Sequence, residues 1–311
     1  MHTRAKRFLI LAILVAAGVS ALSAYFNRYY LGVAIDVGIN IILAVSLNLI
    51  NGHTGQFSLG HAGFMAVGGY TAAAITLAIT PHLSGSPSVV LSGLLFAGSL
   101  LAGGLLAAIA GLAVGIPTLR LRGDYLAIVT LGFGEIIRVV LQNMECVGAA
   151  SGLSGIPERT TLFWSFGLAA VTVYVIGSLV NSTYGRGFIA VHDDEVAASA
   201  SGINPTRYKV TAFVIGAFFA GLAGGLFAHH KLFLSPTNFD FMKSIDIVVM
   251  VILGGMGRTG GVIVAAIILT LLPEFLRPFA EYRMIIYALL IILLMIARPQ
   301  GLFSFGRAKA A

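Results

Sequence analysis

Apolar segments of about 20 residues, each long enough to cross the hydrocarbon core of a bilayer as a helix, recur along almost the whole chain. This pattern limits the possible folds more than any other feature of the sequence. Hydrophobic residues make up 58% of the 311 residues and charged residues only 10%, which is typical of α-helical membrane proteins. We therefore predict an all-α, polytopic integral membrane protein in which residues 1–311 form a single transmembrane domain.

Ten segments are predicted to be membrane helices. Their approximate bounds are 8–24, 29–50, 56–80, 89–116, 124–143, 162–180, 206–229, 245–256, 261–276 and 284–297. The eighth is too short to cross alone, because a dozen residues rise only about 18 Å against a core of roughly 30 Å. Residues 245–276 are therefore one bent span or two half-spans, and the prediction is 8–10 transmembrane helices, some broken or re-entrant.

The basic residues predict the orientation of these helices, because Lys and Arg are enriched in cytoplasmic loops. If the spans alternate, one side of the membrane receives Arg4, Lys6, Arg7, Arg120, Arg122, Arg186, Arg207 and Lys209. The C-terminal Arg298, Arg307 and Lys309 favour the same side, and therefore ten crossings. We expect a multi-pass protein of a bacterial-type cell (inner) membrane with both termini in the cytoplasm.

The N-terminal segment has a second interpretation. A basic stretch followed by apolar residues 8–24 is also the pattern of a secretory signal peptide. Such peptides carry an apolar part of only about 7–15 residues, so an uncleaved first helix is expected.

Composition also bears on ligands. The net charge of +7 is expected to set topology and to meet anionic headgroups rather than nucleic acid, because no soluble basic domain is present. The single cysteine, Cys146, excludes an intrachain disulfide and a multi-thiol metal site. His53 and His61 lack a credible set of further metal ligands, so no metal is expected.

One long polar segment, residues 181–209, interrupts the apolar pattern. The acidic run 193–195 lies where a short helix should begin, because carboxylates there accept free N–H groups and suit the positive end of the helix dipole. Gly202 suits the C-terminal cap of that helix, and Asn204-Pro205 predicts the start of the next membrane helix. The segment is either a short helix near 193–201 that meets a partner or an ordinary solvated loop.

Several stretches, taken in order, resemble one family. They read GHTGQFSLGHAG (52–63), LRLRGDYLAIVTLG (119–132), SGLSGIP (151–157), YGRGFIAVHDDEVAASASGINPTRYK (184–209) and ILGGMG (252–257). Together they resemble the LivM-type branched-chain amino-acid permeases of ABC importers. In that family the polar loop, here 181–209, is cytoplasmic and carries the coupling helix that docks on the ATPase subunit.

The resemblance implies coupling residues and partners. The residues are Arg186, Asp193, Asp194, Glu195, Ala197, Ala198, Gly202 and Arg207. Against the general importer pattern Glu-Ala-Ala-x-x-x-Gly, Val196 occupies the Glu position and Glu195 lies one residue earlier. The implied partners are a LivH-like second permease, two ABC ATPase subunits, an external solute-binding protein and an amino-acid substrate.

The energy source is expected on other subunits. The sequence contains no Gly-x-x-x-x-Gly-Lys-Ser/Thr phosphate loop, which is the usual cradle for ATP phosphates. No segment is long enough to fold a nucleotide-binding domain. We therefore predict no cofactor in this chain, with ATP and Mg²⁺ bound by the partner subunits, and no enzymatic activity of its own.

A second candidate site surrounds residues 54–63. Its glycines and polar side chains predict an interrupted helix lining an aqueous path, where exposed N–H groups receive an amino-acid carboxylate. The predicted substrate path comprises Gly55, Gln56, Ser58, Gly60, His61, Thr130 and Glu135. The alternative is helix packing through small residues, with His61 hydrogen-bonded to a neighbour.

Ionisable residues inside the spans are also candidates, because such groups are costly in lipid. They are Asp36, Glu135, Arg138 and Asp246. Glu135 and Arg138 lie three residues apart and are expected to pair, and Asp36 and Asp246 lie near span ends. The segment Gly255-Met-Gly-Arg-Thr-Gly260 has the Gly-x-Gly-x-x-Gly spacing of a dinucleotide-binding motif. It joins apolar membrane segments and lacks the strand–turn–helix setting of that motif, so dinucleotide binding is not expected.

Gly254, Gly255 and Gly257 are therefore interpreted as a hinge between half-helices. Taken together, these features lead to the hypothesis of a permease subunit of an ATP-driven ABC importer for branched-chain or related hydrophobic amino acids. The alternative is an ion-coupled secondary transporter of a small solute, using Asp36, Glu135 or Asp246. An intramembrane enzyme is disfavoured because no nucleophile–base pair stands out. A passive channel is not excluded by the sequence. The sequence also does not identify the transported solute, which could be leucine, another hydrophobic amino acid, urea or a short amide.

Overall fold

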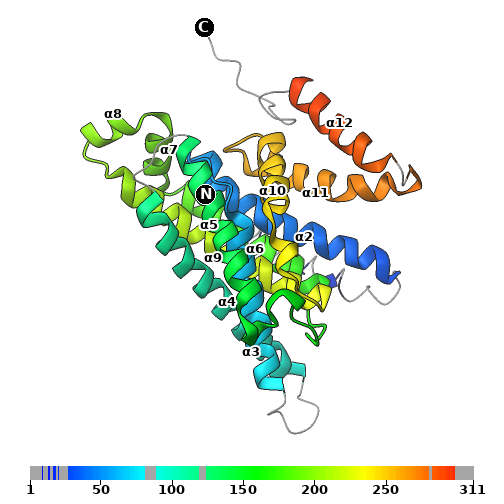
Figure 1. The fold of residues 1–311 in the computed structure, drawn as a ribbon. Helices are drawn as coiled ribbons and strands as arrows, with labels where there is room; N and C mark the ends of the chain where they lie inside the picture. The colour runs from blue at the N-terminus through cyan, green and yellow to red at the C-terminus, as the bar shows by residue number, and fades with distance from the viewer. Residues whose placement is uncertain are drawn as a thin grey trace.

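A computed structural model describes residues 27–80, 89–118, 124–279 and 282–297, together with a few single positions before residue 27. The secondary structure of these residues is helical, apart from one isolated antiparallel bridge between Leu153 and Leu234. The all-α prediction is therefore confirmed (Figure 1).

The helices follow one another with few long connections. In chain order they are α2 (Arg28–Asn48), α3 (His61–Ile79), α4 (Val89–Thr118), α5 (Asp124–Asn143), α6 (Leu162–Val180), α7 (Gly185–Asp193), α8 (Glu195–Ala200), α9 (Pro205–Lys231), α10 (Phe241–Gly254), α11 (Thr259–Phe275) and α12 (Arg283–Ala297). Short 3₁₀ turns lie in the connections after α5, α9 and α11.

Six helical segments among the described residues are long and apolar enough to cross a membrane. They are 28–53, 61–79, 90–117, 125–143, 162–180 and 205–231, and the apolar helix α11 is shorter. A multi-pass membrane protein is thus confirmed. Apart from a few single positions, the predicted first span lies outside the described residues, as do the basic residues at both ends of the chain and Arg120 and Arg122.

The predicted helix 56–80 is wrong at its start. After α2 the chain continues through a π-helical turn, Leu49–His53, and stays non-helical until α3 begins at His61. Gly55, with φ of +68°, has the left-handed backbone that glycine adopts without strain. The interruption that the glycines and polar residues predicted is therefore real, and it lies before α3 rather than within it.

The core forms where α3, α4 and α9 cross at short range. A Cβ added to Gly68 of α3 would overlap the backbone of Gly221 on α9, and one added to Gly103 of α4 would meet the carbonyl oxygen of Gly68. Small residues allow such close approach. In a membrane the hydrophobic effect does not drive helices together, so the van der Waals contacts of this close packing stabilise their association instead. This packing holds the three helices as one block (Figure 1).

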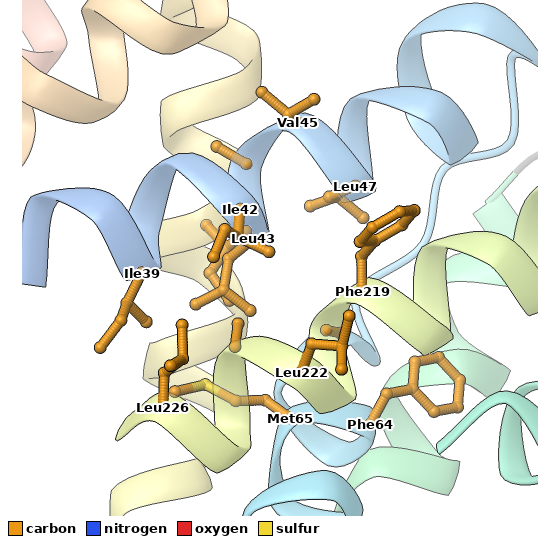
Figure 2. Packing of buried hydrophobic residues seen from close by; sticks show 14 of the residues in the cluster. Ile39, Ile42, Leu43, Val45, Leu47, Phe64, Met65, Phe219, Leu222 and Leu226 are labelled. Carbon is orange, nitrogen blue, oxygen red and sulfur yellow. The ribbon is translucent and has the colours of Figure 1, made fainter. Parts of the chain in front are cut away.

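Helix α2 is the most enclosed of the spans. In its apolar window 83% of the residues are buried, against 22% for α5 and for α6. Figure 2 shows Ile42, Leu43 and Leu47 of α2 directed at side chains of α9 such as Leu222. The helix therefore crosses the interior with protein on nearly every side, and polar residues on it face protein rather than lipid.

Two ends of the bundle can be distinguished. The loop end is the end at which α7 and α8 lie, close to the C-terminal end of α2 (Figure 1). The C-terminus of α6, the N-terminus of α9 and the α10–α11 turn also lie there. The opposite end holds the N-terminal half of α2 and the C-terminus of α9, which are joined by an ion pair between Asp36 and Lys231.

Candidate functional site

The short helix α8 has the caps that the sequence predicted. The carboxylate of Asp194 accepts hydrogen bonds from the backbone N–H groups of Val196 at 2.8 Å and Ala197 at 3.0 Å. At the other end Gly202 has φ of +83°, and Ile203 N–H donates to the Ala198 carbonyl at 3.0 Å, which is the Schellman pattern. Both ends of this helix are thus fixed by its own sequence.

The start of α9 is also as predicted. The side chain of Asn204 accepts from the backbone N–H of Arg207 at 3.2 Å, and Pro205 occupies the first turn. An ion pair also holds the start of α9 against α8, because Lys209 Nζ donates to Glu195 Oε2 at 2.7 Å. Glu195 therefore links α8 to α9, a role that the sequence did not reveal.

Helix α7 was not predicted. Phe188 is fully buried, and its ring packs against the rings of Tyr184 and Tyr208. Tyr184, Phe188 and buried Val191 follow a helical spacing that the sequence could have revealed. Gly185 and Gly187 hid this signal, because glycine disfavours helix. The polar loop is therefore two helices, α7 packed on the bundle and α8 beyond it.

The exposed surface of α8 differs from the expected one. Ala198 is only 4% exposed, so it faces the bundle. Six of the other predicted coupling residues are exposed: Arg186, Asp193, Asp194, Ala197, Gly202 and Arg207. Val196 is exposed beside them. Ala198 faces the bundle because it lies on the opposite side of α8 from exposed Val196, and α8 packs against the bundle through that side.

The non-helical segment 54–60 returns into the bundle with its polar side chains enclosed. Asn51 Oδ1 accepts from Ser58 N–H at 3.2 Å, and Gln56 Nε2 donates to Thr54 Oγ1 at 2.9 Å. His61 Nε2 lies 2.9 Å from Ser46 Oγ of α2. Non-helical backbone at this depth is tolerated only inside protein or beside a water-filled cavity, and this segment meets the first condition.

Three buried side-chain atoms among the described residues lack a hydrogen-bond partner, and all three belong to this segment or the first residue after it. They are Gln56 Oε1, Ser58 Oγ and His61 Nδ1. A buried polar group without a partner costs about 1–3 kcal/mol. This concentration of unpartnered groups sets the segment apart from the rest of the core.

The other predicted path residues lie in different settings. Thr130 Oγ1 of α5 accepts from Leu59 N–H at 3.0 Å, so Thr130 does join the segment. Gly60 packs against the backbone of Thr130, whereas Gly55 is exposed and lies beside His192 of α7. Glu135 instead pairs with Arg138 Nε at 2.7 Å on its own helix.

The glycine hinge docks on the end of α2. Helix α10 ends at Gly254, and Gly255 and Gly257 have φ of +91° and +79°. The backbone N–H of Gly257 donates to Asn48 Oδ1 at 2.9 Å. A helix precedes the turn, so the strand that a dinucleotide fingerprint requires is absent from this described segment.

A cavity of about 470 Å³ joins these separate segments. It is lined by Gly52, His53, Gly177, Val180, Asn181, Ile189, His192, Met256, Gly257, Arg258 and Thr259. The lining thus comes from the end of α2, the end of α6, α7 and the α10–α11 turn. The polar loop and the glycine turn, which the sequence presented as unrelated segments, therefore line the same cavity.

Charges dominate the opposite end. Lys231 Nζ donates to Asp36 Oδ2 at 2.7 Å, and His230 Nε2 lies 3.7 Å from Asp36 Oδ1. Lys243 Nζ of α10 reaches Asn40 Oδ1 at 3.5 Å. Asp36 of α2 is therefore paired with two residues at the end of α9.

The remaining titratable residues add no site. His229 is fully buried and bonds to Gly225 O at 2.8 Å and Thr76 Oγ1 at 3.0 Å. Asp246 is exposed. Within the described part of the chain, no group of three His, Cys, Asp or Glu residues lies close enough to hold a metal ion.

Comparison with known proteins connects this arrangement to transport. Residues 29–297 match the family described as "Branched-chain amino acid transport system / permease component". The chain is 38% identical to the "High-affinity branched-chain amino acid transport system permease protein LivM" of Salmonella typhimurium and to that of Escherichia coli K12, over 98% of this chain and 76% of each relative.

A more distant relative has a related role. The LivH permease protein of the Salmonella typhimurium branched-chain amino acid transport system is 22% identical, over 85% of this chain and 90% of LivH. No solved structure matches the chain. From the extent of the family match and the identity to LivM, the chain belongs to the family of permease components of branched-chain amino acid transport systems.

Proposed function

We propose that this chain is a permease subunit of an ATP-driven ABC importer for branched-chain or related hydrophobic amino acids. Its relatives are permease proteins of branched-chain amino acid transport systems. The chain moves the substrate and performs no covalent chemistry. ATP and Mg²⁺ are bound by two separate ATPase subunits, and a LivH-like second permease and an external solute-binding protein complete the importer.

The observation that carries the proposal is the connection between α8 and the cavity. Exposed α8 is braced on α9 by Glu195 and Lys209 and follows directly after α7, whose Ile189 and His192 line the cavity. The same cavity is lined by Met256, Gly257 and Arg258 of the glycine turn. A push on α8 by a partner is therefore transmitted to the hinge through a short path of contacts.

The orientation of the chain follows from this assignment. The ATPase subunits lie in the cytoplasm, so the loop end is cytoplasmic, and alternation of the spans puts both termini on the same side. This orientation agrees with the basic residues of the loop, Arg186, Arg207 and Lys209. The protein is placed in the inner membrane of a bacterial-type cell.

The predicted route of the substrate passes the unpartnered groups of the 54–61 segment. Gln56 Oε1, Ser58 Oγ and His61 Nδ1 have no partner in this arrangement, so a polar solute or water that reaches them gains hydrogen bonds without breaking others. Thr130 supports the segment from α5. Glu135 contributes to the route only if its pair with Arg138 opens.

One experiment tests the energy source. The chain, purified with its companion subunits, is placed in vesicles with ATP inside, and uptake of labelled leucine from the external binding protein is measured with ion gradients dissipated. ATP-dependent uptake is expected to continue. If uptake stops when the gradients are removed, the chain is an ion-coupled secondary transporter instead.

A second experiment tests the coupling surface. Ala197→Trp places a bulky ring on the exposed face of α8 and is expected to lower uptake and ATPase co-purification at least tenfold, with normal amounts of chain in the membrane. The matched control is Thr183→Trp, exposed in the turn before α7 and outside α8. Equal, normal uptake in both variants excludes α8 as the docking helix.

A further inference from the structure

Backbone N–H groups of the non-helical segment before α3, and of the first turn of α3, already donate within the bundle. Five such bonds are formed: Gln56 to Ile50 O at 3.2 Å, Ser58 to Asn51 Oδ1 at 3.2 Å, Leu59 to Thr130 Oγ1 at 3.0 Å, Ala62 to Ser244 Oγ at 3.2 Å and Gly63 to Gly60 O at 3.1 Å. None of these five N–H groups is free to receive a carboxylate.

The side-chain amide of Gln56 is oriented by its neighbours. Thr54 Oγ1 donates its one proton to Ile50 O at 2.7 Å, so it can only accept from Gln56 Nε2, which lies 2.9 Å away. The amide nitrogen therefore faces Thr54. The amide oxygen, Gln56 Oε1, is left as a hydrogen-bond acceptor without a partner.

The imidazole of His61 is oriented in the same way. Ser46 Oγ lies 3.0 Å from Leu43 O and 2.9 Å from His61 Nε2, and a hydroxyl has one proton to donate. Both bonds form only if Ser46 donates to Leu43 O and His61 Nε2–H donates to Ser46 Oγ. The imidazole proton then lies on Nε2, and Nδ1 is an acceptor without a partner.

The segment therefore has a surplus of acceptors rather than donors. Gln56 Oε1 and His61 Nδ1 can only accept, and the hydroxyl of Ser58, which also lacks a partner, can do either. All three side chains are at most 2% exposed. A ligand that suits these atoms brings N–H donors into the bundle.

The segment adjoins the cavity at the loop end. Gly52 and His53, which line that cavity, come directly before it in the chain. Gly55 and Phe57, within the segment, are exposed. A solute in the cavity therefore meets the stretch of chain that leads to the unpartnered atoms.

We propose that residues 56–61 bind the ammonium group of the passing amino acid, with Gln56 Oε1, His61 Nδ1 and Ser58 Oγ accepting its hydrogen bonds. A primary ammonium carries three N–H donors, and a charge inside the bundle needs such bonds to offset its lost hydration. Breaks in membrane helices provide binding groups of this kind in transporters. The inference rests on the proposed function and names the end of the substrate that the segment recognises.

The test measures binding to the chain purified with its companion subunits, without ATP and without the external binding protein, by saturation-transfer NMR. Three compounds carry the side chain of leucine: 3-methylbutylamine lacks the carboxylate, 4-methylpentanoate lacks the ammonium, and 4-methylpentanamide has a neutral amide instead. The amine is expected to displace leucine at concentrations about tenfold lower than the other two, because hydrogen bonds from a charged donor are the stronger ones.

Ser58→Ala separates binding from folding. It removes a buried atom that has no partner in the folded chain, so thermal unfolding should occur at the wild-type temperature or above it, while binding of the amine weakens about tenfold. The matched control is Ser99→Ala on α4, because Ser99 is also buried but its Oγ donates to Phe96 O at 2.8 Å. This control should keep wild-type binding without a gain in stability.

A second variant covers the case in which Ser58→Ala does not assemble. Gln56→Met removes the acceptor Oε1 and keeps the length of the side chain, and it should weaken binding of the amine to the same extent. Its bond to Thr54 is lost as well, so only the binding measurement is used for this variant.

Several outcomes overturn the inference. A segment that holds only water gives no displacement of leucine by the amine. Displacement by 4-methylpentanoate or by the neutral amide at the same concentration as the amine excludes an ammonium site, and so does wild-type binding of the amine in Ser58→Ala. Each of these results leaves the proposed function intact if the wild-type assembly takes up leucine with ATP. Absence of that uptake contradicts the proposed function instead.

Discussion

The two ends of the bundle are held together by different interactions, although helix α2 takes part in both. At the loop end, Asn48 of α2 receives the N–H of Gly257, and a cavity of about 470 Å³ lies beside this contact. At the opposite end, Asp36 of α2 is paired with Lys231 at 2.7 Å, and Asn40 meets Lys243.

This difference indicates which end is open. A neutral backbone contact next to a cavity can separate without exposing a charge, whereas α2 and α9 can part at the opposite end only after Asp36 and Lys231 have separated. We interpret the arrangement as closed at the opposite end and open at the loop end. The following variants test that interpretation.

The largest effect is expected from Gly52→Val. An added Cβ at Gly52 would meet the side chain of Asn48 and the backbone of Gly257, so the contact between the end of α2 and the glycine turn cannot form. A destabilisation of about 1–3 kcal/mol and a loss of most uptake are expected, measured by thermal unfolding in detergent and by transport. Gly167→Val is the control, because nothing lies within 4 Å of a Cβ added there.

A smaller effect is expected from Lys209→Met. This change removes the 2.7 Å contact to Glu195 and loosens α8 from α9, while the apolar stem of the side chain is kept. Uptake should fall severalfold and ATP hydrolysis should continue, so that more ATP is consumed per leucine transported. Lys209→Arg should restore the wild-type ratio of ATP consumed to leucine transported. A wild-type ratio in Lys209→Met shows that the Lys209–Glu195 ion pair plays no part in coupling.

The ion pair at the opposite end is expected to contribute about 1 kcal/mol or less, because its side chains are partly exposed and such pairs are screened. A double-mutant cycle with Asp36→Asn and Lys231→Met measures this coupling energy through thermal unfolding. The same variants should increase labelling of a cysteine introduced at Gly32 by a reagent added outside. Unchanged labelling is evidence that the pair does not hold this end closed.

The smallest effect is expected from Glu135→Gln. Glu135 pairs with Arg138 within one helix, and pairs at this spacing contribute about 0.2–0.5 kcal/mol. Stability and uptake should both stay within a factor of two of the wild type. A tenfold fall in uptake with unchanged stability places Glu135 on the substrate path after all.

Local sequence predicted much of this fold, and the reasons can be traced to particular residues. Apolar runs predicted the long helices because a bilayer imposes their length. Asp194, Gly202 and Asn204 predicted the ends of α8 and the start of α9, since a cap acts over only a few residues. The roles of these residues in coupling to an ATPase remain predictions.

The features that the sequence did not reveal share a different cause. The pairing of Asp36 with Lys231 joins residues 195 positions apart, and no local pattern records such a distance. The inward side of Ala198 and the convergence of His53, His192 and Arg258 on one cavity likewise depend on how whole helices pack. Only α7 was missed despite a local signal, the apolar spacing of Tyr184, Phe188 and Val191.

The buried break before α3 has a consequence for biogenesis. The N–H of Ala62, in the first turn of α3, donates to Ser244 Oγ of α10, 182 residues later in the chain. During synthesis, α2 and α3 enter the bilayer before α10 has been made. The N–H of Ala62 therefore lacks this acceptor until 182 further residues have been made, and a nascent chain that stalls before α10 leaves the first turn of α3 incomplete and open to quality-control proteases.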